Sequence, residues 1–213
     1  MGRLIEPLIL YVILFLPGAM KAGPPPELAA FSAAGELRRI FLFNIPSLAL
    51  IWHLLLQPAS RFSPQKKQLP RFHLQDLYSA LFALPALLLI GFSIALVSSR
   101  FGIPAGINIE APSAISGWIV MALSCLSTGY LEESYFRYYL LGKLEAACHS
   151  PVTAVLAGVL LFSACHIYEG PWGVLNAFLA GTMLSLVFVR FRSIHGIALA
   201  HGLYNIFVYA MGV

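Results

Sequence analysis

The sequence predicts an all-α fold, a polytopic transmembrane bundle of about seven helices. Three observations favour this fold class. Hydrophobic residues make up 59% of the chain and charged residues only 10%, whereas soluble globular domains contain about 25% charged residues. The mean hydropathy is +0.82. Several apolar stretches approach the ~20 residues with which a helix crosses a bilayer.

Proline, glycine and charged residues divide the apolar stretches and so define the predicted helices. The first stretch follows Arg3 and is short, but no small-x-small cleavage site follows it, so we expect a retained span rather than a signal peptide. The three prolines at 24–26 cannot continue a helix. Residues 58–73 form the most polar segment and must lie outside the hydrocarbon. The predicted helices cover residues 4–17, 38–57, 75–98, 115–147, 151–168, 172–190 and 195–212.

The basic residues predict the orientation in the membrane. With seven spans, one side carries Arg3, Arg61, Lys66, Lys67, Arg71, Lys143, Arg190 and Arg192, and the other carries Lys21, Arg38, Arg39 and Arg100. Because basic residues favour the cytoplasmic side, we expect a multi-pass protein of the inner or plasma membrane with a cytoplasmic amino terminus. The net charge of +4 reflects these loop residues. It indicates the lipid bilayer as a partner and gives no indication of nucleic acid.

Three of the apolar stretches contain polar residues with a partner four positions away. They are Glu132, Glu133 and Arg137 in LEESYFRYYL, Phe162 and His166 in FSACH, and His201 and Asn205 in HGLYN. A spacing of four places two side chains on one helix face. Ionisable groups at membrane depth are costly unless they pair or line a polar cavity, so this cluster is a functional-site hypothesis.

The two glutamates are not equivalent. Glu133 and Arg137 share a face, which predicts an ion pair. Glu132 is turned by about 100° from its neighbour, so we expect it to be the free carboxylate and a general base. The alternative is that all three residues form one structural ion network.

The histidine motifs suggest partners for that base. His166 would help Glu132 to hold and deprotonate a water, and His201 with Asn205 would stabilise the oxyanion formed when water attacks a carbonyl. Taken alone, His166 fits better an interfacial or core residue that makes one hydrogen bond, and His201 with Asn205 fits better a helix–helix hydrogen-bond contact. The other four histidines are given no role.

The ordered set EExxxR, FxxxH and HxxxN resembles the CPBP family of intramembrane proteases, also called the type II CAAX prenyl endopeptidase or ABI family. The resemblance covers roughly residues 115–213 and includes the segment FLAGTMLSLVFVRFRSIHGIALAH. It implies a single membrane domain over residues 1–213, with variable amino-terminal helices in 1–114 and a protease-like core in 115–213.

The resemblance also implies residue roles, which agree with those suggested by helix geometry. Glu132 and His166 would activate the water, His201 and Asn205 would form the oxyanion hole, and Glu133, Arg137 and Phe162 would support the site. One position departs from the family pattern, because Tyr138 stands where the family usually has glycine. We expect this difference to affect the cavity or the substrate rather than the chemistry.

The predicted function is therefore hydrolysis of a peptide bond in a membrane-tethered protein or peptide, with a CAAX-type, bacteriocin-type or carboxy-terminal sorting-signal substrate. No cofactor is expected. A zinc protease of the same fold is an alternative because Glu and His bind zinc, but the sequence has no HExxH and zinc sites usually gather three close ligands. A transporter or a non-catalytic immunity protein is the remaining alternative.

Cys125, Cys148 and Cys165 show no metal-binding spacing and are read as small buried hydrophobes.

Overall fold

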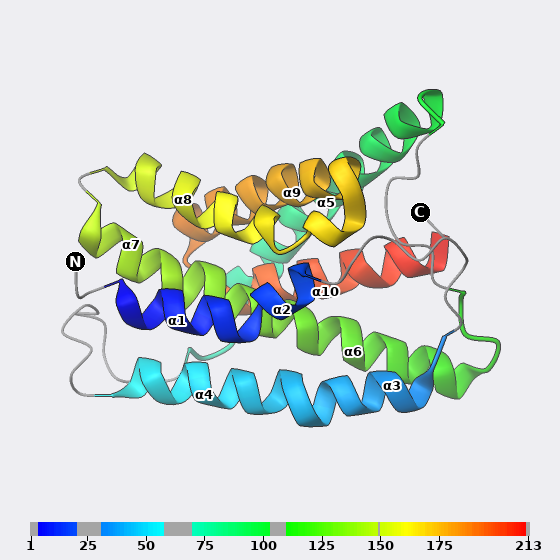
Figure 1. Cartoon of the computed structure of the whole chain (residues 1–213), viewed down its shortest axis with the longest axis horizontal. Coiled ribbons are helices and arrows are strands. Elements are labelled where there is room, and N and C mark those ends of the chain that lie inside the picture. The colour runs from blue at the N-terminus through cyan, green and yellow to red at the C-terminus, as the bar shows by residue number, and fades with distance from the viewer. Residues whose placement is uncertain (1–3, 21–30, 58–69, 103–109, 149, 212–213) are drawn as a thin grey trace.

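The computed structural model describes residues 4–20, 31–57, 70–102, 110–148 and 150–211, and all regular elements in these ranges are helical (Figure 1). The predicted all-α class is thus confirmed. The elements are α1 (Ile5–Leu14), α2 (Leu16–Ala19), α3 (Ala33–Arg38), η1 (Arg39–Asn44), α4 (Ile45–Leu56), α5 (Leu74–Arg100), α6 (Ile115–Glu133), η2 (Ser134–Leu140), α7 (Leu141–Ala147), α8 (Pro151–Ala164), η3 (Ile167–Glu169), α9 (Gly170–Phe191) and α10 (Ile194–Met211). The proline-rich loop and most of segment 58–73 lie outside the described residues.

Four helical stretches of the described chain are long and apolar enough to cross a membrane. They are Ala33–Leu56, Leu74–Arg100, Ile167–Phe191 and Ile194–Met211, whereas Ile5–Leu14 and Pro151–Ala164 are shorter apolar helices. In Figure 1, α4 and α7 end on the left, whereas α3 and α6 begin and α10 ends on the right. The architecture is that of a helical membrane bundle.

Two predicted boundaries were wrong. The second helix begins at Ala33 rather than near residue 38, because Ser32 caps it by accepting a hydrogen bond from the Gly35 N–H at 3.2 Å. The fifth helix ends at Ala164 rather than at 168. There the backbone tightens, since the N–H of His166 donates to the Ser163 carbonyl three residues back. His166 therefore lies beyond α8, ahead of the short helix η3.

Helix α10 packs against both α5 and α6. Glycines allow the approach to α6, since a Cβ on Gly129 would lie 2.9 Å from the backbone nitrogen of Gly202 and 2.9 Å from the carbonyl oxygen of Ala198. Small residues at a helix interface let two membrane helices come this close. The contact brings the end of α6, with its two glutamates, against the middle of α10.

A buried polar cluster fixes the start of α10 on α5. Ser193 Oγ donates a hydrogen bond to Asp76 Oδ1 and accepts one from the Gly196 N–H at 3.0 Å. Ser79 Oγ lies 2.8 Å from Ser193 Oγ. A Cβ on Gly196 would lie 1.8 Å from Ser79 Oγ, so only glycine fits there. This cluster sets where α10 begins and hence the height of His201 along the bundle.

Candidate active site

Glu133 is the centre of a buried hydrogen-bonded cluster. Its side chain has 0% exposure, and its Oε1 accepts hydrogen bonds from Arg137 Nη1 at 2.9 Å and from His201 Nδ1 at 2.7 Å. The ion pair predicted from the spacing of Glu133 and Arg137 is present. The bond from His201 joins α10 to α6 and was not predicted, because the two motifs are 68 residues apart.

Arg137 is held by groups from two further helices. Its Nη2 donates to the carbonyl oxygen of Gly181 on α9 at 3.2 Å, and its guanidinium lies 4.2 Å from the ring centroid of Phe162 on α8. A Cβ on Gly181 would lie 2.8 Å from the Phe162 ring and 3.2 Å from Arg137 Nη2. Gly181 and Phe162 together form the site for a fully buried arginine, and neither contact follows from helical spacing within one segment.

Glu132 is the accessible carboxylate of the pair. Its side chain is 17% exposed, and its Oε2 lies 3.7 Å from His201 Nε2. The His201 ring is therefore flanked by both glutamates, with Nδ1 toward Glu133 and Nε2 toward Glu132. Because a carboxylate only accepts, the bond to Glu133 requires the hydrogen on Nδ1. Nε2 is the nitrogen that faces the accessible carboxylate.

His166 lies next to this cluster through Phe162. The ring centroid of Phe162 is 4.8 Å from that of His166 and 6.1 Å from that of His201. Nδ1 of His166 is 2.9 Å from the Phe162 carbonyl oxygen, which accepts only, so Nδ1 carries the hydrogen. Nε2 of His166 is then left with a lone pair able to accept a hydrogen bond.

The last two predicted positions have different surroundings. Asn205 is half-buried one turn beyond His201 on α10 and makes no hydrogen bond with another described side chain. Tyr138 packs against Trp52 of α4, with ring centroids 5.8 Å apart, and against Phe188 of α9 at 6.2 Å. The tyrosine thus fills a space between two helices in place of the glycine expected there.

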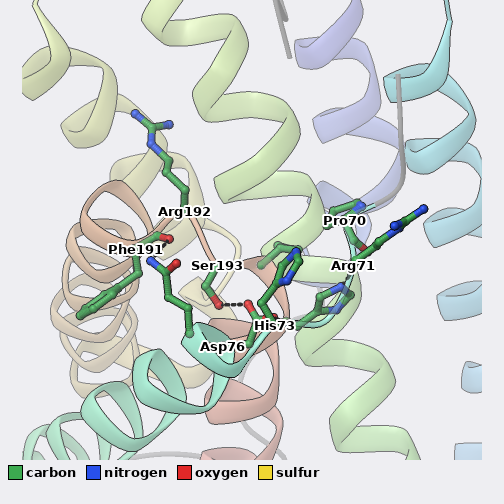
Figure 2. Close-up of a pocket in the computed structure, with 10 residues that line it drawn as sticks. Pro70, Arg71, His73, Asp76, Phe191, Arg192 and Ser193 are labelled. Atoms are coloured by element: carbon green, nitrogen blue, oxygen red, sulfur yellow. Dashed lines mark hydrogen bonds between the residues drawn. The ribbon is translucent and has the colours of Figure 1, made fainter. Parts of the chain in front are cut away.

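Figure 2 shows a pocket of about 200 Å³ that is separate from this cluster, at the start of α5 and the connection between α9 and α10. His195 Nε2 donates to the Pro70 carbonyl oxygen at 3.0 Å, and Gln75 Nε2 donates to the Phe191 carbonyl oxygen at 2.9 Å. The dashed bond in Figure 2 is that of Ser193 with Asp76. None of the predicted site residues lines the pocket, and its hydrogen bonds serve to fix the helix ends.

In the part of the chain that the structure describes, the side chains able to bind a metal do not gather at one point. Within the ranges given above, no three His, Cys, Asp or Glu side chains are arranged to hold a metal ion. Glu133 and His201 instead bond to each other. Cys125 and Cys165 are buried and Cys148 is half-buried, and all three are free.

Comparison with known proteins finds one family that the part of the chain holding these motifs resembles. Residues 114–207 match the family model described as type II CAAX prenyl endopeptidase Rce1-like. These residues are similar to that family. The match includes all three motifs and confirms the resemblance predicted from them. No curated protein and no solved structure gave a match. The similarity to this family indicates a peptidase and, with the apolar helices, a membrane protein.

Proposed function

We propose that this chain is an intramembrane endopeptidase that hydrolyses a peptide bond of a membrane-tethered protein or peptide, with a water activated by Glu132. One observation carries the assignment of the base. Of the two adjacent carboxylates, Glu133 is fully buried and bonded to Arg137 and His201, whereas Glu132 is 17% exposed and faces His201 at 3.7 Å. A general base must reach both the water and the substrate, and Glu132 is the carboxylate that can.

Charge balance supports a functional pair of glutamates at this depth. Glu132 and Glu133 carry two negative charges, and Arg137 with a protonated His201 carries two positive charges. Buried charges are tolerated when they are paired and hydrogen-bonded. In this state His201 donates from Nδ1 to Glu133 and still has an N–H on Nε2 to offer to a reacting group.

The proposed reaction uses the groups in a fixed order. Glu132 accepts a proton from the water, with Nε2 of His166 accepting the water's other hydrogen as a hydrogen bond, and the hydroxide attacks the carbonyl carbon. His201 Nε2–H and the Asn205 amide donate hydrogen bonds to the oxyanion. The C–N bond then breaks as Glu132 returns the proton to the departing amine, leaving a carboxyl group and an amine.

The substrate class follows from the family and not from the geometry. A CAAX-type protein is the substrate we favour, and bacteriocin-type and carboxy-terminal sorting-signal peptides belong in the same test. The proposed arrangement in the membrane is multi-pass with a cytoplasmic amino terminus, supported by the excess of basic residues on one side of the predicted spans.

The test is cleavage of a panel of membrane-tethered peptides by purified protein in lipid nanodiscs. Glu132→Gln keeps the volume of the side chain but cannot accept the proton of the water, so cleavage should fall by at least about two orders of magnitude. Glu110→Gln, at an exposed position ahead of α6, is the matched control and should cleave normally. A Glu132→Gln protein that cleaves at the wild-type rate would remove Glu132 from the mechanism.

A further inference from the structure

Two rows of polar side chains run from the candidate active site toward the end of the bundle where α6 begins and α10 ends (Figure 1). Residues four apart lie on one helix face. Helices α6 and α10 pack against each other and run in opposite directions, so the two rows border the same seam. The rows are Ser124, Thr128 and Glu132 on α6, and His201, Asn205 and Tyr209 on α10.

The two rows touch at the inner end and are linked by Arg39 at the outer end. At the inner end, Glu132 lies 3.7 Å from His201. At the outer end, Arg39 from η1 donates to Ser124 Oγ at 2.7 Å and lies close to Tyr209. Arg39 thus contacts the last member of each row.

Side chains from the helical stretch Ala33–Leu56 cover the seam. Arg39 forms an ion pair with Glu36 at 2.7 Å, and these side chains are 39% and 21% exposed. Further in, buried Asn44 donates a hydrogen bond to Thr128 Oγ1 at 3.1 Å. The covering residues are polar as well, so the seam has polar groups along its whole length.

The exposure of the side chains along the seam distinguishes a closed helix–helix contact from a path that water can enter. Polar residues between membrane helices often serve only to hold the helices together. Here, however, Thr128, Asn205 and Glu132 are each half-buried, whereas Gly129 and Glu133, which face α10, are buried. Thr128 lies about 6 Å along the helix from Glu132 at 1.5 Å per residue. The partly exposed positions therefore run from Thr128 to the carboxylate, and Ser124, which is 1% exposed and bonded to Arg39, closes their outer end.

We propose that this seam is the route by which water reaches Glu132, with Arg39 and Glu36 at its outer end. The proposal rests on the proposed function in one respect, because each cleavage consumes a water. Hydrocarbon supplies none, and a polar path is the means by which water enters a site at membrane depth.

The test measures access directly and needs no substrate. Cys125, Cys148 and Cys165 are replaced by alanine, and Thr128→Cys is introduced into that background. The matched control is Leu123→Cys, on the opposite side of α6 and 53% exposed. Both proteins, in lipid nanodiscs, are treated with a permanently charged methanethiosulfonate. Only a thiolate reacts, and a thiolate forms in water, so the Thr128→Cys protein should be labelled about tenfold faster or more.

The control is conservative because Leu123 lies nearer to the start of α6 than Thr128, so depth alone would favour its labelling. Adding Arg39→Ala removes the side chain at the outer end and should speed the labelling of Thr128→Cys further. If the Thr128→Cys protein does not fold, the same comparison is made on α10 between Asn205→Cys and Phe207→Cys, where Phe207 is 45% exposed.

Equal labelling of the seam cysteine and its control would overturn the route, even if Glu132→Gln abolishes cleavage. Faster labelling of the seam cysteine in a protein that cleaves normally with Glu132→Gln would keep the route and reject the proposed base. The labelling experiment therefore tests the water route, and the cleavage experiment tests Glu132 as the base, independently of each other.

Discussion

Removing the guanidinium of Arg137 should strongly destabilise the protein. Arg137 is 1% exposed and Glu133 is 0% exposed, and Arg137→Met leaves that carboxylate buried without its cation. The substitution also removes the hydrogen bond to the Gly181 carbonyl and the contact of the charge with the Phe162 ring.

The loss in the free energy of unfolding can be estimated from these contacts. Breaking a buried ion pair by removing one partner costs about 3–5 kcal/mol. Glu133 keeps its hydrogen bond from His201, so we place the cost at the lower end, about 3 kcal/mol, which is roughly a 150-fold change in the folding equilibrium. Cleavage should also fall, because His201 would shift to compensate the charge of Glu133.

The assay is thermal or denaturant unfolding in detergent, with Arg100→Met as the control. Arg100 is exposed at the end of α5, and a surface change of this kind is expected to stay within about 0.5 kcal/mol. The double variant Glu133→Gln/Arg137→Met should recover at least about 1 kcal/mol of the loss, because it no longer buries an unpaired charge. The explanation by a buried unpaired charge is wrong if Arg137→Met has the same free energy of unfolding as Arg100→Met. It is also wrong if the double variant is no more stable than Arg137→Met.

Three further predictions follow from the packing and the proposed chemistry. Gly129→Ala places a Cβ 2.9 Å from the backbone of α10, so it should cost about 1–3 kcal/mol and lower the cleavage rate. Gly142→Ala, with no atom within 4 Å of its Cβ, should cost nothing by the same unfolding assay. Ser193→Ala removes the donor to Oδ1 of buried Asp76, whose Oδ2 keeps its bond from the His73 N–H, and should cost about 1–3 kcal/mol, measured by denaturant unfolding; unchanged stability would mean that this cluster does not anchor α10. Cleavage should survive exhaustive chelation, whereas activity lost with a chelator and restored by zinc would replace the glutamate mechanism with a metal-dependent one.

Much of this protein is determined by local sequence. The apolar stretches predict the helices, since a backbone in hydrocarbon must bond internally. The spacing of Glu133 and Arg137 predicts their ion pair, because both ends of that contact lie on one helix face. The three motifs in order likewise predict a resemblance to the family, which the match over residues 114–207 confirms.

The contacts between helices were decided only by the tertiary structure. The ring of His201 lies between Glu132 and Glu133 on α6, a position that its spacing from Asn205 does not indicate. The carbonyl of Gly181 and the ring of Phe162 complete the site of Arg137 from two other helices. Helical spacing indicates which side chains share a face, but which faces meet depends on how closely and at what height two helices pack. Here that is set by glycines such as Gly129 and by the cluster that anchors the start of α10, and neither has a periodic signal in the sequence.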